Sequence, residues 1–422
     1  MERHAAPHPL ERHFARNVAG ISLVELLWGL GLPPVFESTF LQLFLRQLGA
    51  SSLLIGTVPT LVAAGGALSS LFAFSLTAHL ERRRTATILV HVASSLPLLA
   101  FGMTLGIGGI RASTLSLFLS LYALFSLAMG VLLPVWQNYV TKIFSERATV
   151  PAMAIMMTTQ SAARLVGSLY LARLVARYSF SASGVSLVFT LAGLLFLAGS
   201  FPFLLTVERD GRRAAQDAPA PPPPMPSRRH ALRRVLADRA FLSFLGTELE
   251  YFALSGVIAF YANYATEFRG VSPALASGLF MACMYVGGVL ANAILGWANL
   301  LSLRGKYLLT KSAALAGLVL LALHGAPWVF FLASFLFGAS RGARFMVFMP
   351  AVKRLAGQAD ATLYFAVAPV LVLPFSTGLP LLNGAFIDRF ASLGAAAYQA
   401  VFLAMAVLCL AGIFFAFRMK RD

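Results

Sequence analysis

Charged residues and cysteines are scarce in this sequence. Only 12% of its 422 residues are Asp, Glu, Lys or Arg, whereas soluble domains carry about 25%, so the composition argues against a soluble globular protein. The two cysteines, Cys283 and Cys409, fall inside apolar stretches, where buried thiols behave as small hydrophobic side chains. We therefore expect neither a disulfide nor a metal site from them.

Enzyme and nucleotide-binding motifs are also missing. The sequence contains no G-x-x-x-x-G-K-[ST] loop for ATP, no H-E-x-x-H, no G-x-S-x-G and no C-x-x-C, and its histidines lack metal-ligand spacing. We expect no enzyme activity, no cofactor and no metal. The N-terminal stretch MERHAAPHPLERHFARNVAG has no short apolar core before a small-residue cleavage site, so we expect no cleaved signal peptide.

Apolar residues are abundant, at 59% of the chain. They form stretches of about 20 residues, each long enough to cross a bilayer of about 30 Å. These stretches are apolar nearly all round, unlike the amphipathic helices of soluble proteins, and ten-residue alternating segments typical of outer-membrane barrels are missing. We predict an all-α integral membrane protein with twelve transmembrane helices, centred near residues 31, 66, 98, 124, 160, 195, 251, 285, 316, 338, 373 and 406.

The net charge of +17 is unevenly distributed. One set of alternating loops, together with both termini, holds 23 of the Lys and Arg residues, the opposite set holds 6, and 4 lie within spans. Such a bias marks the cytoplasmic side of a membrane protein. We therefore predict cytoplasmic termini in an inner (cytoplasmic) membrane, with lipid rather than nucleic acid as the partner of the positive charge.

The chain divides into two halves with internal similarity. Residues 207–239 form a basic, Pro-rich stretch that we expect to be a cytoplasmic linker, between six-helix halves at 1–206 and 240–422. GTVPTLVAAGGAL, at 56–68, matches GLFMACMYVGGVL, at 278–290, with its glycines in register. Repeats of this kind occur in secondary transporters.

In this arrangement the chain resembles the major facilitator superfamily. SLTAHLERRRT, at 75–85, is similar to the basic motif that follows the second span in that family, although Ser75 and His79 replace its first Gly and its Asp. The resemblance implies a fold of two pseudo-symmetric six-helix bundles and a cavity lined mainly by spans 1, 4, 7 and 10. It also implies a cytoplasmic gating loop, whose candidate residues here are Arg82, Arg83 and Arg84, with Arg304 and Lys306 in the repeat copy.

Three glutamates lie inside predicted spans, where an ionisable residue usually marks function. Glu25 is in span 1, and Glu248 and Glu250 are in span 7. Successive helical residues turn by about 100°, so we expect only one of the span-7 pair to face a cavity, and the sequence does not decide which. Each carboxylate is interpreted as a proton carrier, a structural partner of an arginine, or a substrate ligand.

Cationic and aromatic residues complete the candidate set. Arg341, in span 10, is expected either to anchor an anionic substrate group or to pair with one of the span-7 glutamates, and Arg164, in span 5, is interpreted in the same way. Arg344 and Lys311 are expected to extend to the cytoplasmic interface. Trp28 and Tyr251 are candidates for lining the cavity, with simple packing as the alternative.

These patterns together predict a secondary active transporter that moves a small organic solute by alternating access. Proton coupling through Glu25 and a span-7 glutamate is a hypothesis within that prediction. The alternative is a non-transporting receptor or scaffold on a transporter fold, which the altered residues in 75–85 favour. The expected partners are a small-molecule solute, protons and membrane lipids, and the expected state is a monomer.

Overall fold

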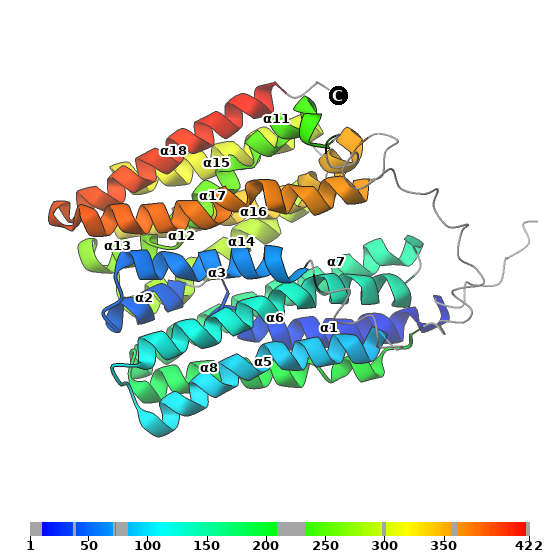
Figure 1. Ribbon diagram of the computed structural model, residues 1–422, viewed down its shortest axis with the longest axis horizontal. Helices are drawn as coiled ribbons and strands as arrows, with labels where there is room; N and C mark the ends of the chain where they lie inside the picture. Colours follow the sequence, from blue (N-terminus) through cyan, green and yellow to red (C-terminus); the bar gives the residue numbers. More distant parts are fainter. Residues whose placement is uncertain are drawn as a thin grey trace, which may run out of the picture. The chain divides into compact units, whose positions relative to one another are not determined.

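A computed structural model gives the structure of the protein, shown in Figure 1. It describes residues 11–36, 39–70, 72, 83–144, 146–208, 233, 235–297, 301–356 and 361–418. The described residues are helices joined by short turns, without a β-strand among them. The prediction of an all-helical chain is therefore confirmed for this part.

Along the sequence, the helices lie before or after the central stretch near residue 220. Those before it are α1 Phe14–Gly31, α2 Thr39–Gln47, α3 Ser52–Ser70, α5 Arg83–Gly108, α6 Thr114–Ile143, α7 Glu146–Tyr178 and α8 Ala182–Gly199. Those after it are α11 Arg239–Thr247, α12 Leu249–Ile258, α13 Tyr261–Phe268, α14 Phe280–Asn292, α15 Leu303–Leu323, α16 Pro327–Ala356, α17 Ala361–Arg389 and α18 Ala395–Phe417. Short 3₁₀ or π turns are η1 Glu11–His13, η2 Pro202–Leu205, η3 Leu275–Leu279, η4 Ala293–Trp297 and η5 Ala391–Leu393.

Nine stretches among the described residues are long and apolar enough to cross a membrane. The predicted spans outside this set are the first, fifth and tenth, which correspond to α1 with α2, to α7 and to α16. These segments carry the intramembrane charges Glu25, Arg164, Arg341 and Arg344, which lower their hydropathy. The count of twelve spans stays a prediction.

Spans 1 and 7 are interrupted, which the apolar pattern alone did not indicate. In span 1, α1 ends at Gly31 just before Pro33 and Pro34, and α2 begins at Thr39. Proline has no backbone N–H and clashes with the preceding turn, so the helix stops there. Span 7 is divided into α11, α12 and α13, with breaks at Glu248 and at Ala259 and Phe260. Discontinuous helices of this kind build binding sites in transporters.

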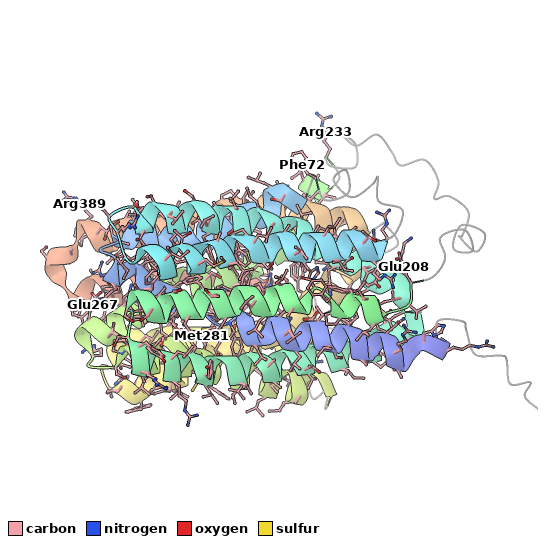
Figure 2. The ribbon with its side chains drawn as sticks, turned by 90° about the horizontal axis from the view of Figure 1, so that it is seen from below. Phe72, Glu208, Arg233, Glu267, Met281 and Arg389 are labelled. Atoms are coloured by element: carbon pink, nitrogen blue, oxygen red, sulfur yellow. The ribbon has the colours of Figure 1, made fainter. Side chains whose placement is uncertain are left out.

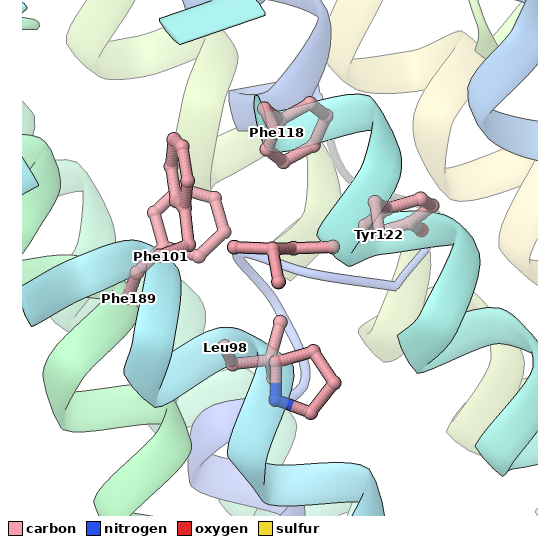
Figure 3. Close-up of a pocket in the computed structure, with 7 residues that line it drawn as sticks. Leu98, Phe101, Phe118, Tyr122 and Phe189 are labelled. Atoms are coloured by element: carbon pink, nitrogen blue, oxygen red, sulfur yellow. The ribbon is translucent and has the colours of Figure 1, made fainter. Parts of the chain in front are cut away.

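The chain forms two compact units, which we describe separately. Unit 1 comprises Met1–Leu32, Gly65–Gly167 and Ala182–Pro223. In it α5 packs along α6 and α8, and α1 packs along α8 (Figure 1). Figure 3 shows a small pocket between α5, α6 and α8. Phe101 lies 5.3 Å from Phe118 and 4.8 Å from Phe189 between ring centroids, so this region is a packed aromatic core.

Unit 2 comprises Pro33–Ala64, Ser168–Ser181 and Pro224–Asp422. In it α16 packs along α14 and α15, and α18 packs along α12 and α15. The contact between α14 and α16 is very close, since a Cβ atom on Gly338 would lie 1.8 Å from the carbonyl oxygen of Met284. Small residues allow such close helix approach in membranes. Figure 2 shows Glu267 and Arg389 at one end of this unit and Arg233 towards the other.

Unit 2 also contains α2, the first part of α3 and the end of α7. These segments precede the central linker in sequence, yet they pack with the C-terminal helices. The compact units therefore follow other boundaries than the predicted halves at 1–206 and 240–422. The division into two six-helix halves with a 207–239 linker stays a prediction, and residues 209–232 and 234 of that linker lie outside the described residues.

Candidate functional site

The break in span 7 places two carboxylates in the interior of unit 2. Glu248 ends α11 and precedes α12, and its backbone N–H donates to the carbonyl of Leu245, at 3.0 Å, three residues earlier. Such a tight turn within a helix often marks a functional position. Glu248 and Glu250 are each 1% exposed. Burying a carboxylate is costly unless it is paired, so each needs a partner.

Glu248 is paired with Arg344 of α16. The Nε of Arg344 donates to Glu248 Oε2 at 2.5 Å, and its Nη2 lies 2.5 Å from the same oxygen. The guanidinium also stacks on Tyr251, 4.0 Å from the ring centroid, and on Phe348, at 4.9 Å. The expectation that Arg344 extends to the interface is wrong, because a charge-assisted hydrogen bond within reach is the stronger interaction.

Glu250 has different partners, on α15 and α16. Ser340 donates a hydrogen bond to Glu250 Oε1, and Lys311 Nζ lies 3.5 Å from Glu250 Oε2. The Lys311 side chain is fully buried, and its ammonium sits 4.8 Å from the ring centroid of Tyr307. The expectation that Lys311 extends to the interface is also wrong. Its carboxylate partner lies inside the helix bundle, so the ammonium stays there.

Arg341 lies one turn before Arg344 on α16, so the two side chains share a helix face. Its Nη2 donates to the hydroxyl of Tyr251 at 3.3 Å, and its guanidinium carbon is 5.2 Å from that ring's centroid. Arg341 and Tyr251 are both half-buried. The structure thus brings together four predicted site residues, namely Glu248, Glu250, Tyr251 and Arg341.

A second polar group lies in unit 1. Glu25 of α1 is 5% exposed and accepts a hydrogen bond from the side-chain amide of Gln160 on α7. Arg164, one turn further along α7, is close enough for its charge to act on Glu25. The two helices touch here, since a Cβ atom on Gly29 would lie 2.7 Å from Ala163 Cβ. The predicted residues Glu25 and Arg164 are therefore neighbours.

Trp28 lies three residues after Glu25 and packs within unit 1. Its ring stacks on Phe196 with centroids 4.1 Å apart and meets His91 edge-on at 4.9 Å. The Trp28 side chain is 5% exposed. A cavity-lining role for Trp28 stays a prediction.

The predicted gating-loop residues have local contacts of their own. Arg82 lies outside the described residues. The backbone N–H groups of Arg83 and Arg84 donate to the two carboxylate oxygens of Glu208, at 3.0 and 3.1 Å. In the repeat copy, Arg304 lies 5.5 Å from the ring centroid of Phe417, and Lys306 lies in the first turn of α15. A gating role for any of these stays a prediction.

Sequence reasoning missed two contributors to these sites. Ser340 is not among the predicted site residues, although its hydroxyl donates a hydrogen bond to Glu250. Glu208 was taken as part of the linker, although it caps α5, which has no acidic residue in its own first turn. An acidic residue near a helix start favours the helix dipole, but sequence distance hid which helix Glu208 would reach.

Comparison with known proteins gives the family. The Major Facilitator Superfamily profile matches residues 35–372. The chain therefore belongs to the major facilitator superfamily, as its sequence had suggested, and it is a multi-pass membrane protein. A comparison with curated proteins gives no match.

Solved structures share its fold. A point mutant of the nucleoside transporter NupG has a TM-score of 0.70 at 12% identity, over 96% of this chain and 100% of that one. A bacterial homologue of the human drug peptide transporters PepT1 and PepT2 has a TM-score of 0.68 at 14% identity, over 96% and 97%.

A bacterial homologue of the human lysosomal transporter Spinster, in an inward-facing and occupied conformation, is also similar. Its TM-score is 0.66 at 15% identity, over 98% of this chain and 97% of that one. Membership of this family points to a transporter rather than an enzyme, and it does not favour the non-transporting alternative.

Proposed function

We propose that the protein is a secondary active transporter that moves a small organic solute across the inner membrane by alternating access, coupled to protons. The observation that carries the proposal is the Glu248–Arg344 pair at the break in span 7, beside Arg341 and Tyr251. A carboxylate that is paired with a partly exposed guanidinium can release it and bind a proton instead. The guanidinium is then free to bind a solute. Ion pairs of this kind mark substrate and proton pathways in membrane proteins.

In this proposal Glu248 faces the solute, whereas Glu250 has a structural role and stabilises the packing of the helices. Support comes from the exposure of their partners. The Arg344 side chain is 18% exposed, and Arg341 and Tyr251 are half-buried. By contrast, the Lys311 and Ser340 side chains that hold Glu250 are fully buried. The face of span 7 that carries Glu248 is therefore the one a solute can reach.

The charges suggest how coupling would work. Around the break in span 7, the buried or half-buried cations Lys311, Arg341 and Arg344 outnumber Glu248 and Glu250 by one. A guanidinium keeps its proton at any physiological pH, whereas a carboxylate can lose its charge. A proton on Glu248 would leave Arg344 free to pair with an anionic group of the solute. Proton and anion would then move together without net charge.

Tyr251 narrows the solute class. Its ring lies against both guanidinium groups, so a planar or aromatic part of a solute would find an apolar face beside the charges. Nucleosides and peptides enter as candidates because transporters of these solutes share the fold. Glu25, with Gln160 and Arg164, is the second proton-binding candidate, on unit 1.

The remaining predicted features belong to the same proposal. They are twelve spans in two six-helix halves, cytoplasmic termini, a cytoplasmic linker at 207–239, and a monomer. The strong excess of basic residues in one set of loops supports the orientation.

A ligand screen tests the proposed site. The purified protein would be heated with a panel that holds uridine, alanyl-alanine, benzoate and neutral sugars. We expect a panel member to raise the melting temperature of the wild type and to lose that effect in Arg341→Ala and Glu248→Gln. Arg389→Gln, which removes an exposed charge at the end of α17, should leave the stabilising effect of the ligand unchanged. A ligand that stabilises all variants equally would place its site elsewhere.

A further inference from the structure

The end of α17 holds the start of α3 through one carboxylate in unit 2. Asp388 Oδ1 accepts a hydrogen bond from the backbone N–H of Ser52 at 2.7 Å, and Oδ2 accepts one from Leu53 at 2.8 Å. The first N–H groups of a helix have no partner within the helix. The same end carries the positive pole of the helix dipole. α3 has no acidic residue in its own first turn, so Asp388 supplies the negative charge.

The contact continues along both helices at backbone distance. A Cβ atom on Gly384 would lie 2.4 Å from the carbonyl oxygen of Ser52, and one on Gly56 would lie 2.4 Å from that of Pro380. One turn further, Thr60 Oγ1 donates to the carbonyl of Thr377 at 2.9 Å. The Asp388 cap therefore lies at one end of a close helix contact that extends from Ser52 to Thr60 on α3.

An ion pair lies at the same end of unit 2. Arg46 of α2 donates to both carboxylate oxygens of Glu267, at 2.7 and 3.2 Å, with side chains that are 37% and 27% exposed. Exposed ion pairs of this kind contribute little and are screened by salt.

We propose that Asp388 is a positioning residue of the transport cycle. Its carboxylate holds α3 against α17 and so keeps this end of the protein closed. In the predicted topology these helices belong to different six-helix halves, and this end faces away from the cytoplasm. Opening it requires Ser52 and Leu53 to leave the carboxylate. The Arg46–Glu267 pair contributes less than Asp388 to keeping this end closed. The inference rests on the proposed alternating access.

Distance measurements between spin labels test this closure without any solute. Labels would be placed at Gln47→Cys, the exposed last residue of α2, and at Ser392→Cys, in the exposed turn after α17. The full-length chain would carry Cys283→Ser and Cys409→Ala and would be held in lipid nanodiscs. The variants compared are Asp388→Asn, Asp388→Glu and Glu267→Gln. Arg389→Gln, which changes the neighbouring exposed charge, is the matched control.

We expect one short distance in the background protein and a second, longer distance in Asp388→Asn. Losing a charge-assisted cap should raise the population of the open form by roughly tenfold. Asp388→Glu should restore most of the closed form. Glu267→Gln should change the population by less than about threefold, and Arg389→Gln should not change it. The inference is overturned if Asp388→Asn matches the background protein, or if Glu267→Gln opens it as much.

A salt titration provides a test that needs no substitution at Asp388. Raising the NaCl concentration screens the exposed Arg46–Glu267 pair. It weakens only the dipole part of the Asp388 cap and leaves the two hydrogen bonds from Ser52 and Leu53 in place. The short distance in the background protein should persist from low to high salt. A salt-induced long distance would mean that the Arg46–Glu267 pair holds this end closed, which overturns the assignment to Asp388. If the protein opens as expected but carries no solute, the proposed transport fails while the closure stands.

Discussion

Replacing Lys311 tests directly whether the buried ion pair between Lys311 and Glu250 stabilises unit 2. Replacing it with Met keeps the length of the side chain and removes the ammonium 3.5 Å from Glu250 Oε2. Glu250, 1% exposed, would then keep the hydrogen bond from Ser340 while losing its opposite charge. Removing one partner of a buried ion pair costs about 3–5 kcal/mol.

Thermal unfolding in detergent measures this cost. At about 2–4 °C per kcal/mol, a cost of about 3–5 kcal/mol means that Lys311→Met should lower the melting temperature by roughly 6–20 °C. The double variant Lys311→Met with Glu250→Gln should regain most of that loss, because the amide is neutral and can still accept from Ser340. Arg389→Met, at an exposed position of α17, should change little. If Lys311→Met melts like the wild type, or if the double variant melts lower still, Glu250 and Lys311 do not stabilise each other.

Three further outcomes follow from local geometry. Gly338→Ala should lower the melting temperature by more than about 5 °C, because its Cβ would lie 1.8 Å from the carbonyl oxygen of Met284. Gly378→Ala, with nothing within 4 Å of its Cβ position, should stay within about 0.5 kcal/mol of the wild type; equal losses at both glycines would refute the close packing. Glu208→Gln should cost about 1 kcal/mol by weakening the α5 cap, seen as a melting temperature about 2–4 °C lower, and an unchanged value would mean that the cap contributes nothing.

Apolar patterning was enough to predict nine of the membrane-crossing stretches among the described residues, since helix length and hydropathy are set by the bilayer. It was not enough to predict the break at Glu248. No proline or glycine stands at that position, and the partner of its carboxylate, Arg344, lies 96 residues away in the sequence. The break after Gly31 had a local signal in Pro33 and Pro34, which the length of the apolar stretch concealed.

The sequence likewise predicted only part of the candidate site. Intramembrane charge was sufficient to single out Glu25, Glu248, Glu250 and Arg341. Which cation each span-7 glutamate would pair with was left open, because sequence position gives depth in the membrane but not the facing helix. Lys311 and Arg344 lie near enough to a predicted interface to suggest that they extend towards water, yet each finds a buried carboxylate on span 7.

The most direct test of the central claim is solute uptake into proteoliposomes under an imposed pH gradient, with the ligand found by the thermal screen. We predict that the wild type accumulates the solute when the gradient drives protons in the same direction. Glu248→Gln should lose that dependence, while Arg389→Gln retains it. Uptake that ignores the gradient in the wild type, or that persists undiminished when both Glu248 and Glu25 are Gln, would contradict proton coupling through these residues.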